Sequence, residues 1–354
     1  MISVPKVLAL NLMAFLLIGA DTPTPKGYAC GRAKVPIVVD GKLDDAAWRL
    51  APWTDDFVDI EGSAKPLPRY RTRAKMTWDA NYFYIAAELM EPHVQGTFTK
   101  HDSYIFHEDN DFEVFIDPDG DNHEYSELEI NARNTVWDLL LEKPYRDGGP
   151  AIDAWEVPGL KTATHVVGTL NQPADRDESW TVEFAIPWKA FADRAHRPCP
   201  PVDGDRWRVN FSRVEWDFLI EGNAYQKPPD KPEANWVWSP QGVIDMHRPE
   251  LWGDVLFSDA SPGTTNYRPD PDMAARFRLM DVYHAQKAYQ KDHQTWATSL
   301  EALGVGNLPA VADAGPVTIH PTPEGYQAEI TARGGQSPPR TWSIRQDSRL
   351  TRLR

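Results

Sequence analysis

The sequence predicts an all-β protein, an antiparallel β-sandwich of the jelly-roll kind with a small C-terminal α+β appendage. Three observations lead to this fold class. Short stretches of alternating apolar and polar residues recur from about residue 30 to residue 257, separated by turns rich in Pro, Gly and Asp. The chain contains 14 Trp, and a large aromatic side chain suits the core of a sandwich. Beyond residue 271 the composition changes to one that favours a helix.

The clearest alternation lies in residues 112–117, 125–131 and 207–211. In each segment one set of side chains is mainly apolar and the other mainly polar, which is typical of strands with one face on a core. We expect the core face to carry Phe112, Val114, Ile116, Leu128, Ile130, Trp207, Val209 and Phe211. The opposite face then carries Glu113, Phe115, Asp117, Glu127, Glu129, Asn131, Arg208 and Asn210.

The chain is predicted to divide into a leader, the sandwich, a linker and the appendage. The sandwich spans residues 30–257, and the Pro-, Gly- and Asp-rich segment 258–271 reads as an exposed linker. Residues 272–354 form the appendage, with a helix near 272–294 and short strands near 317–320, 326–331 and 342–344. A long helix followed by a small sheet resembles the soluble part of a type IV pilin-like subunit. The partner of this tail is not indicated by the sequence.

Residues 1–20 have the pattern of a secretory signal peptide. Lys6 precedes an apolar run from Val7 to Ile18, and Gly19 with Ala20 supplies the small residues of a cleavage site. The run is too short to cross a bilayer core of roughly 30 Å. We therefore expect a secreted or periplasmic protein without a membrane span.

Cys30 and Cys199 are the two cysteines of the chain. In an oxidising compartment such a pair is expected to form a disulfide. Two unpaired, buried thiols are the alternative.

The net charge of −15 argues against nucleic acid as a partner, because phosphate binding needs clustered Lys and Arg. A neutral ligand such as a glycan is compatible with this charge. The charge alone does not identify the partner; an oligo- or polysaccharide is expected from the resemblance that the following segments carry.

Five segments resemble, in the expected order, the family 9 carbohydrate-binding modules. They are residues 37–48, 74–89, 111–117, 180–188 and 251–255, and the likeness extends over roughly residues 30–257. The resemblance implies a β-sandwich in which two aromatic rings clamp a sugar and polar side chains of a concave sheet bind its hydroxyl groups. Such a protein supports the recognition or breakdown of polysaccharides.

The resemblance also implies site residues. The binding carboxylate of the family falls on Glu113, and the polar row of the next strand falls on Glu129 and Asn131, although the position of Glu129 usually holds an Arg. The two clamp positions fall on His107 and on the Met246–His247 segment, where the family has aromatic rings. Arg208 and Asn210 are expected to supply hydrogen-bond donors. Four tryptophans near strand ends are candidates for a missing platform: Trp137, Trp216, Trp236 and Trp238.

Three other interpretations remain open. A solvated sheet face would account for the same polar side chains without any ligand. Glu113 and Glu129 would also be candidate carboxylates of a glycoside hydrolase, although no motif around them supports catalysis. Relatives of the sandwich fold bind haem b through axial His and Met or Lys, and His107 and Met246 lie close to those positions.

No cofactor is required by the carbohydrate interpretation, but calcium is possible. Asp117, Asp119 and Asp121 place carboxylates at alternate positions, as a hard cation prefers. The EF-hand pattern is not met, because Asn122 stands where its Gly is required. A Pro-Asp-Gly turn with solvated acids explains the segment equally well.

Overall fold

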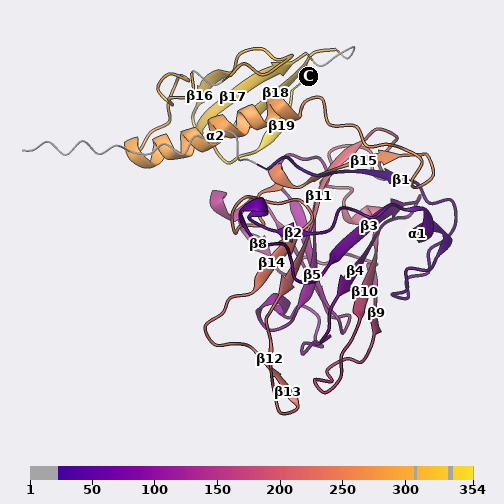
Figure 1. The fold of residues 1–354 in the computed structure, drawn as a ribbon. Helices are drawn as coiled ribbons and strands as arrows, with labels where there is room; N and C mark the ends of the chain where they lie inside the picture. Colours follow the sequence, from indigo (N-terminus) through magenta and orange to yellow (C-terminus); the bar gives the residue numbers. More distant parts are fainter. Residues whose placement is uncertain (1–22, 307–308, 334–337, 354) are drawn as a thin grey trace, which may run out of the picture.

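Two β-sheets stacked face to face form the body of the protein, and a small α+β unit lies against one end of it (Figure 1). The computed structural model describes residues 23–306, 309–333 and 338–353. The predicted signal peptide, residues 1–20, lies outside the described residues. The expected antiparallel β-sandwich with a small C-terminal α+β appendage is confirmed.

The larger sheet has the order β1-β15-β11-β5-β6-β7-β8. Neighbouring strands are antiparallel except β1 and β15, which pair in parallel. The long strand β11 pairs with β15 along one half and with β14 along the other, and β14 pairs with β2. The strands are β1 (Gly27–Gly31), β2 (Val58–Asp59), β5 (Asp111–Asp117), β6 (Tyr125–Asn131), β7 (Val136–Leu141), β8 (Ala151–Ile152), β11 (Arg206–Glu215), β14 (Ala234–Val237) and β15 (Gly253–Ser258).

The smaller sheet of the sandwich has the order β3-β4-β10-β9 and is fully antiparallel. Its strands are β3 (Thr72–Trp78), β4 (Tyr82–Met90), β9 (Lys161–Val167) and β10 (Ser179–Pro187). A separate hairpin of β12 (Leu219–Glu221) and β13 (Ala224–Gln226) projects from the sandwich at the end opposite the appendage (Figure 1).

The helices are short except for one. A single turn, α1 (Ala46–Leu50), precedes the smaller sheet, whereas α2 (Met273–His293) belongs to the appendage. The 3-10 helices are η1 (Gly62–Ala64), η2 (Ile105–His107), η3 (Tyr145–Asp147), η4 (Trp188–Ala190) and η5 (Pro249–Leu251). Among the described residues, no helix combines the length and apolar character that crossing a membrane would require.

The core lies between the two sheets and has the faces that alternation predicts. All eight side chains assigned to the core face are buried there. Trp78, Trp180, Trp188 and Trp207 fill much of the remaining volume, several in edge-to-face contact, the geometry that aromatic pairs prefer. The many tryptophans are thus explained mainly by packing.

The opposite face of the larger sheet is also buried, which the sequence does not indicate. Every residue of β5 and β6 is buried on both faces. Phe115, Tyr125, Leu139, Leu141 and Trp252 form a second apolar cluster on this face, and segments distant in sequence pack over it. The interpretation as a solvated sheet face is therefore wrong.

The C-terminal appendage packs α2 on a four-stranded antiparallel sheet (Figure 1). Its strands are β16 (Thr318–Thr322), β17 (Gly325–Ala332), β18 (Arg340–Arg345) and β19 (Leu350–Arg352). The segment between sandwich and appendage is mostly exposed, as expected of a linker. It is held to β15, however, by a hydrogen bond of 2.8 Å from the Tyr267 hydroxyl to Asp254.

The appendage is docked on the sandwich through polar contacts. The side chain of Asn122 donates to the Ser348 carbonyl at 2.9 Å, and the Leu350 amide donates to the Asp121 carbonyl at 2.9 Å. On η3, Asp147 accepts hydrogen bonds from the hydroxyl groups of Tyr283 at 2.6 Å and Ser348 at 2.7 Å. The appendage therefore forms a specific interface with the loops of the larger sheet.

The predicted disulfide is absent, because Cys30 and Cys199 are both free thiols. Cys30 is fully buried in the main core, and burial raises the pKa of its thiol well above the ordinary value. Cys199 is half-buried, its Sγ donates to the Trp188 carbonyl at 3.2 Å, and burial raises its pKa to about 11. Both thiols act as small apolar groups that pack on the same cluster.

Candidate functional site

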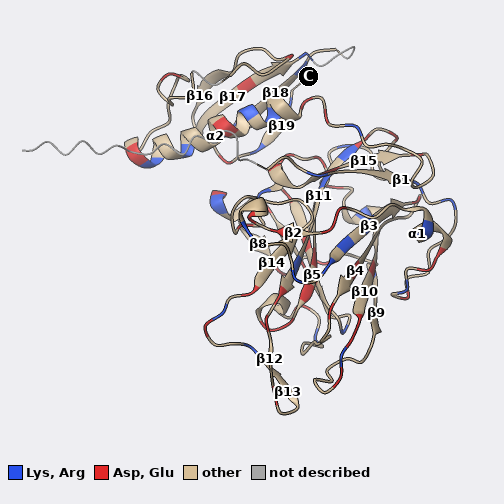
Figure 2. Cartoon of the chain, viewed as in Figure 1, with Lys and Arg blue, Asp and Glu red and all other residues tan. Residues whose placement is uncertain are grey.

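Four carboxylates line the outer face of β5 and β6, and we call them the acid row: Asp111, Glu113, Glu127 and Glu129. Glu113 stands directly opposite Glu129 in the strand register. Carboxylate oxygens of Asp111, Glu113 and Glu129 lie within 4.8 Å of one another. In Figure 2, acidic segments are visible within the larger sheet near the label β5, and not only on the connecting loops.

Burial is the main influence on the electrostatics of the acid row. Each carboxyl group is at most 6% exposed, and the loss of solvation raises the pKa of all four. For Glu113 the pKa rises to about 7, although a hydrogen bond from Ser212 opposes the change. Neighbouring acids raise the pKa of the other three members further.

The acid row has unused hydrogen-bonding capacity. Asp111 Oδ2 and Glu129 Oε2 are buried and make no hydrogen bond with any residue in the described part of the chain. Because burial raises all four pKa values, these carboxyl groups keep their protons to a higher pH than exposed carboxyl groups do, and a protonated carboxyl group can donate as well as accept. The row can therefore both donate and accept hydrogen bonds without Lys or Arg.

Two exposed tyrosines lie beside the acid row. Tyr104, just before η2, is 48% exposed, and Tyr145, at the start of η3, is 53% exposed. Burial of part of each side chain and the charges of Glu127 and Glu129 raise both tyrosine pKa values, that of Tyr145 to about 12. Both hydroxyl groups thus experience the same two carboxylates. We call Tyr104 and Tyr145 the tyrosine pair.

Neighbouring rings hold the tyrosine pair in place. The Tyr104 ring meets Trp137 of β7 edge to face, with ring centroids 4.7 Å apart. On the other side, Tyr145 contacts the ring of His247 at 4.5 Å. The backbone amide of Phe106 donates to Glu129, which ties the loop that carries Tyr104 to the acid row. Trp137, His247 and Glu129 therefore each contact the tyrosine pair or the loop that carries Tyr104.

The residues at the predicted clamp positions, His107, Met246 and His247, make the following contacts. His107 is exposed and its ring contacts Tyr104 at 4.2 Å. The Met246 carbonyl accepts a hydrogen bond from the Trp252 indole at 2.8 Å. His247 lies 3.0 Å from the Tyr125 hydroxyl, and burial together with Arg146 lowers its pKa to about 4. His107 and His247 thus contact the tyrosine pair, and Tyr104 and Tyr145 are the rings whose pKa values Glu127 and Glu129 raise.

Sequence reasoning missed the tyrosine pair because both residues lie in irregular segments. Alternation assigns faces only within strands, and Tyr104 and Tyr145 stand next to or within single turns of 3-10 helix. The closeness of Tyr104 to the predicted clamp at His107 was the one available signal. For Tyr145 the chain offered none.

Asn131 and Asn210 have structural roles. The Asn131 side chain donates to the Phe98 carbonyl and to Asp109, and it accepts from the amides of Arg133 and Thr135. The Asn210 side chain donates to the Ser239 carbonyl at 2.8 Å and accepts from the Ser239 amide at 2.9 Å. Both amides are fully buried and already bonded, so their assignment to the ligand site is not supported.

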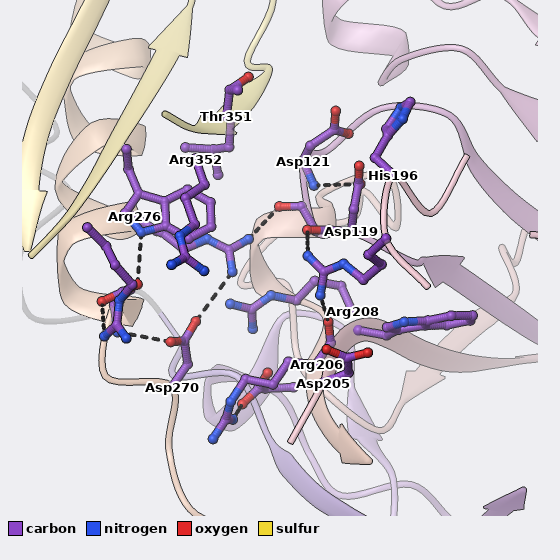
Figure 3. Close-up of a pocket in the computed structure, with 18 of the residues that line it drawn as sticks. Asp119, Asp121, His196, Asp205, Arg206, Arg208, Asp270, Arg276, Thr351 and Arg352 are labelled. Atoms are coloured by element: carbon purple, nitrogen blue, oxygen red, sulfur yellow. Dashed lines mark hydrogen bonds and ion pairs between the residues drawn. The ribbon is translucent and has the colours of Figure 1, made fainter. Parts of the chain in front are cut away.

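Arg208 lies on the same face of the larger sheet as Glu113, but at a distant position on the neighbouring strand β11. Glu113 pairs with Ser212 on β11, and Arg208 lies four positions before Ser212, a distance of about 13 Å along the strand. Arg208 instead lines a cavity between the sandwich and the appendage (Figure 3). It therefore cannot supply donors to the acid row.

The remaining candidate tryptophans are not exposed platforms. Trp236 and Trp238 are buried in the main core. Trp216 is half-buried, its indole donates to the Phe106 carbonyl at 2.8 Å, and the Lys227 ammonium lies 3.6 Å from the centre of its ring.

Two further groups have atoms that suit a metal ion. The carboxylates of Asp117, Asp119 and Asp121 lie within 4.8 Å of one another, as the calcium prediction requires. Asp117 accepts from the amides of Gly120 and Asn122, however, and Asp121 pairs with Arg349 at 2.8 Å. Calcium at this turn stays a prediction.

The second group joins one imidazole and three carboxylates. His101 Nε2 lies 3.3 Å from Asp102, 3.4 Å from Asp138 and 3.0 Å from Glu156. A donor set of one nitrogen and three oxygens suits zinc better than calcium, which prefers oxygen alone.

Comparison with known protein families gives a match to part of the chain. Residues 39–199 match the sequence profile described as carbohydrate family 9 binding domain-like. Comparison with curated protein sequences gave no match.

Three solved structures are similar at low identity. Two are family 9 carbohydrate-binding modules from Caldicellulosiruptor kristjanssonii, in complex with cellotriose (14% identity, TM-score 0.43) and with glucose (15%, 0.44). The third is a putative carbohydrate-binding protein from Bacteroides uniformis (17%, 0.47). The matches cover 69%, 68% and 66% of this chain, respectively, and the whole of each structure. The matched residues 39–199 include the acid row and most strands of the sandwich.

Proposed function

We propose that this protein binds carbohydrate at the acid row, with a sugar ring held between Tyr104 and Tyr145. The observation that carries the proposal is the tyrosine pair itself. Glu127 and Glu129 raise the pKa of both exposed tyrosines, so both tyrosines lie close to the same part of the acid row. A few polar groups beside aromatic surfaces are typical of small-molecule sites.

The chemistry of the acid row suits sugar hydroxyl groups. Each hydroxyl can donate one hydrogen bond and accept others, and a row of mixed carboxylates and carboxylic acids offers both partners. Hydrogen bonds to an ionised carboxylate are the stronger kind. Asp111 and Glu129 each have one carboxyl oxygen that no described residue engages. The tyrosine faces would cover the apolar C–H surfaces of the ring.

The match of residues 39–199 supports the same function, since the matched family is named for carbohydrate binding. A role outside the cytoplasm, in the recognition or breakdown of polysaccharides, is part of the proposal. It is supported by the signal-like pattern of residues 6–20 in the sequence.

Calorimetry on ring variants tests the proposal. The ligands are glucose, cellotriose and oligosaccharides of xylan and mannan, titrated into the full chain. Tyr104→Ala and Tyr145→Ala should each weaken the tightest of these ligands about tenfold, because a buried aromatic contact typically contributes more than 1 kcal/mol to binding. Tyr104→Phe and Tyr145→Phe keep the ring and should retain most of the affinity.

Wild-type affinity in both alanine variants would place the ligand elsewhere. The visible spectrum of the same preparation separates the haem alternative. An absorption band of haem, together with no binding of any glycan, would favour a haem b site that uses His107 and Met246.

A further inference from the structure

A cavity lies between the sandwich and the appendage. Its volume is about 610 Å³, within the range of about 300–1,000 Å³ that small-molecule sites occupy. Residues of both units line it, among them Arg197 and Arg208 of the sandwich and Arg276, Arg340 and Arg349 of the appendage (Figure 3).

Most arginines of the cavity are neutralised by an aspartate. Arg340 pairs with Asp272 at 2.6 Å, Arg349 with Asp121 at 2.8 Å and Arg276 with Asp270 at 3.4 Å. Arg206 pairs with Asp254. Arg197 donates only to backbone carbonyl groups, those of Arg206 at 2.9 Å and Asp119 at 3.1 Å.

Arg208 has no such partner. Its side chain is 3% exposed, yet its guanidinium makes no hydrogen bond or ion pair with any residue that the structure describes, and Nη1 is fully enclosed. Burial and the neighbouring Arg276 lower its pKa. Leaving a buried guanidinium unpaired costs several kcal/mol, so this position needs an anion or water for compensation.

The nearby carboxylates are already engaged by other groups. In the strand register Arg208 lies between Asp117 and Asp254. Asp117 accepts from the amides of Gly120 at 2.8 Å and Asn122 at 2.9 Å, and Asp254 accepts from Arg206 and from Tyr267. Asp270 accepts from Arg276 and from the Asp272 amide.

The charges of Asp254, Asp270 and Asp117 attract Arg208 and partly oppose the lowering of its pKa, but none of these carboxylates forms an ion pair or a hydrogen bond with it. The carboxylate of Asp205 accepts a hydrogen bond from the Val202 amide at 2.9 Å.

We propose that this cavity binds an oxyanion, a phosphate group or the carboxylate of an acidic sugar, with Arg208 as its principal ligand. The planar guanidinium can donate two parallel hydrogen bonds to either group. Because residues of both units line the cavity, the anion bridges the sandwich and the appendage. The cavity lies at the other end of β11 from the acid row, so this site is independent of the proposed glycan site.

Thermal unfolding and calorimetry of the full chain test the site, with inorganic phosphate and glucuronate as probes. Potassium chloride at equal ionic strength is the control for screening, and glucose is the uncharged control for glucuronate. At least one probe should raise the unfolding temperature and bind in calorimetry, whereas chloride should do neither. A response to phosphate alone would identify a phosphate site, and tighter binding of glucuronate would identify an acidic sugar.

Arg208→Gln should weaken the responding probe about tenfold or more, because it removes a charge-assisted pair of hydrogen bonds. In anion-free buffer the variant should unfold at the wild-type temperature or above it, since an unpaired charge has been removed. Arg71→Gln, an exposed arginine beside β3, is the matched control and should bind like the wild type. If Arg208→Gln does not fold, Arg208→Lys retains the charge without the planar fork and should show intermediate affinity.

Two results would overturn the proposal. One is a response to both probes no larger than that to chloride. The other is an Arg208→Gln protein that loses stability in anion-free buffer but keeps full affinity for the probe, since Arg208 would then be structural.

Discussion

Glu113 is buried on β5 with its carboxyl group between Ser212 of β11 and Glu129 of β6. Loss of solvation raises its pKa to about 7, so its charge changes near neutral pH. The neighbouring acids have raised pKa values as well, and the row as a whole holds protons that the unfolded chain releases. The acid row is therefore a cost to folding at neutral pH, as is common for groups that serve binding.

This property predicts a pH dependence of stability. Between about pH 4.5 and pH 7 the folded protein keeps a proton on Glu113 that the unfolded chain has lost, so the free energy of unfolding falls as pH rises through this window. Glu113→Gln removes that contribution and should show a shallower fall. Urea unfolding at pH 5, 6, 7 and 8 measures the difference, with Glu324→Gln in the exposed β16–β17 turn as control. Equal slopes for Glu113→Gln and wild type would contradict the account.

The alternation of residues along a strand predicted which face each side chain occupies. It did not predict whether that face is buried or exposed. Period-two alternation is local, so it assigned Phe112 to the core and Glu113 to the opposite face correctly. Whether that face meets water depends on segments far away in sequence, such as η3 and the residues around Trp252. The same limit applies to Asn131 and Asn210, whose hydrogen-bond partners are set by loop geometry that no strand pattern reports.

At the level of elements, the short helix η3 links the proposed glycan site to the appendage. It carries the exposed Tyr145 at one end and the buried Asp147 at the other. Asp147 accepts from Tyr283 and Ser348 and pairs with Lys287 at 3.1 Å. The contacts of the appendage thus hold η3, and with it Tyr145, in place. This role was not expected, because the sequence predicted that a linker separates the two units.

Asp147→Ala should therefore loosen the docking. The hydroxyl groups of Tyr283 and Ser348 lose their acceptor in a buried interface, which typically costs about 1–3 kcal/mol. We expect a lower free energy of unfolding in urea and faster amide hydrogen exchange in η3 and α2. Asp153→Ala removes an exposed carboxylate that follows β8 and should leave both quantities unchanged. An Asp147→Ala protein with wild-type stability and exchange would show that these contacts do not hold the appendage.

For the whole molecule, the division into a sandwich and an α+β appendage followed from composition and periodicity, because both are properties of long segments. The relative placement of the two units could not be predicted from the sequence, because it depends on a few polar contacts between loops. This placement leaves a cavity that arginines of both units line. The disulfide prediction was wrong for a related reason. Cysteine counts indicate only that pairing is possible, whereas Cys30 and Cys199 are positioned by the packing of the core.

The central claim is that the acid row binds carbohydrate, and calorimetry of Glu113→Gln at two pH values tests it most directly. The wild type should bind at least one of the oligosaccharides, and Glu324→Gln should match it. At pH 8 Glu113 is ionised, so Glu113→Gln should weaken binding by about 1.5–3 kcal/mol, the usual contribution of a hydrogen bond to a charged group. At pH 5.5 the loss should be smaller, since Gln resembles the protonated acid. An affinity that Glu113→Gln leaves unchanged at pH 8 would contradict the account.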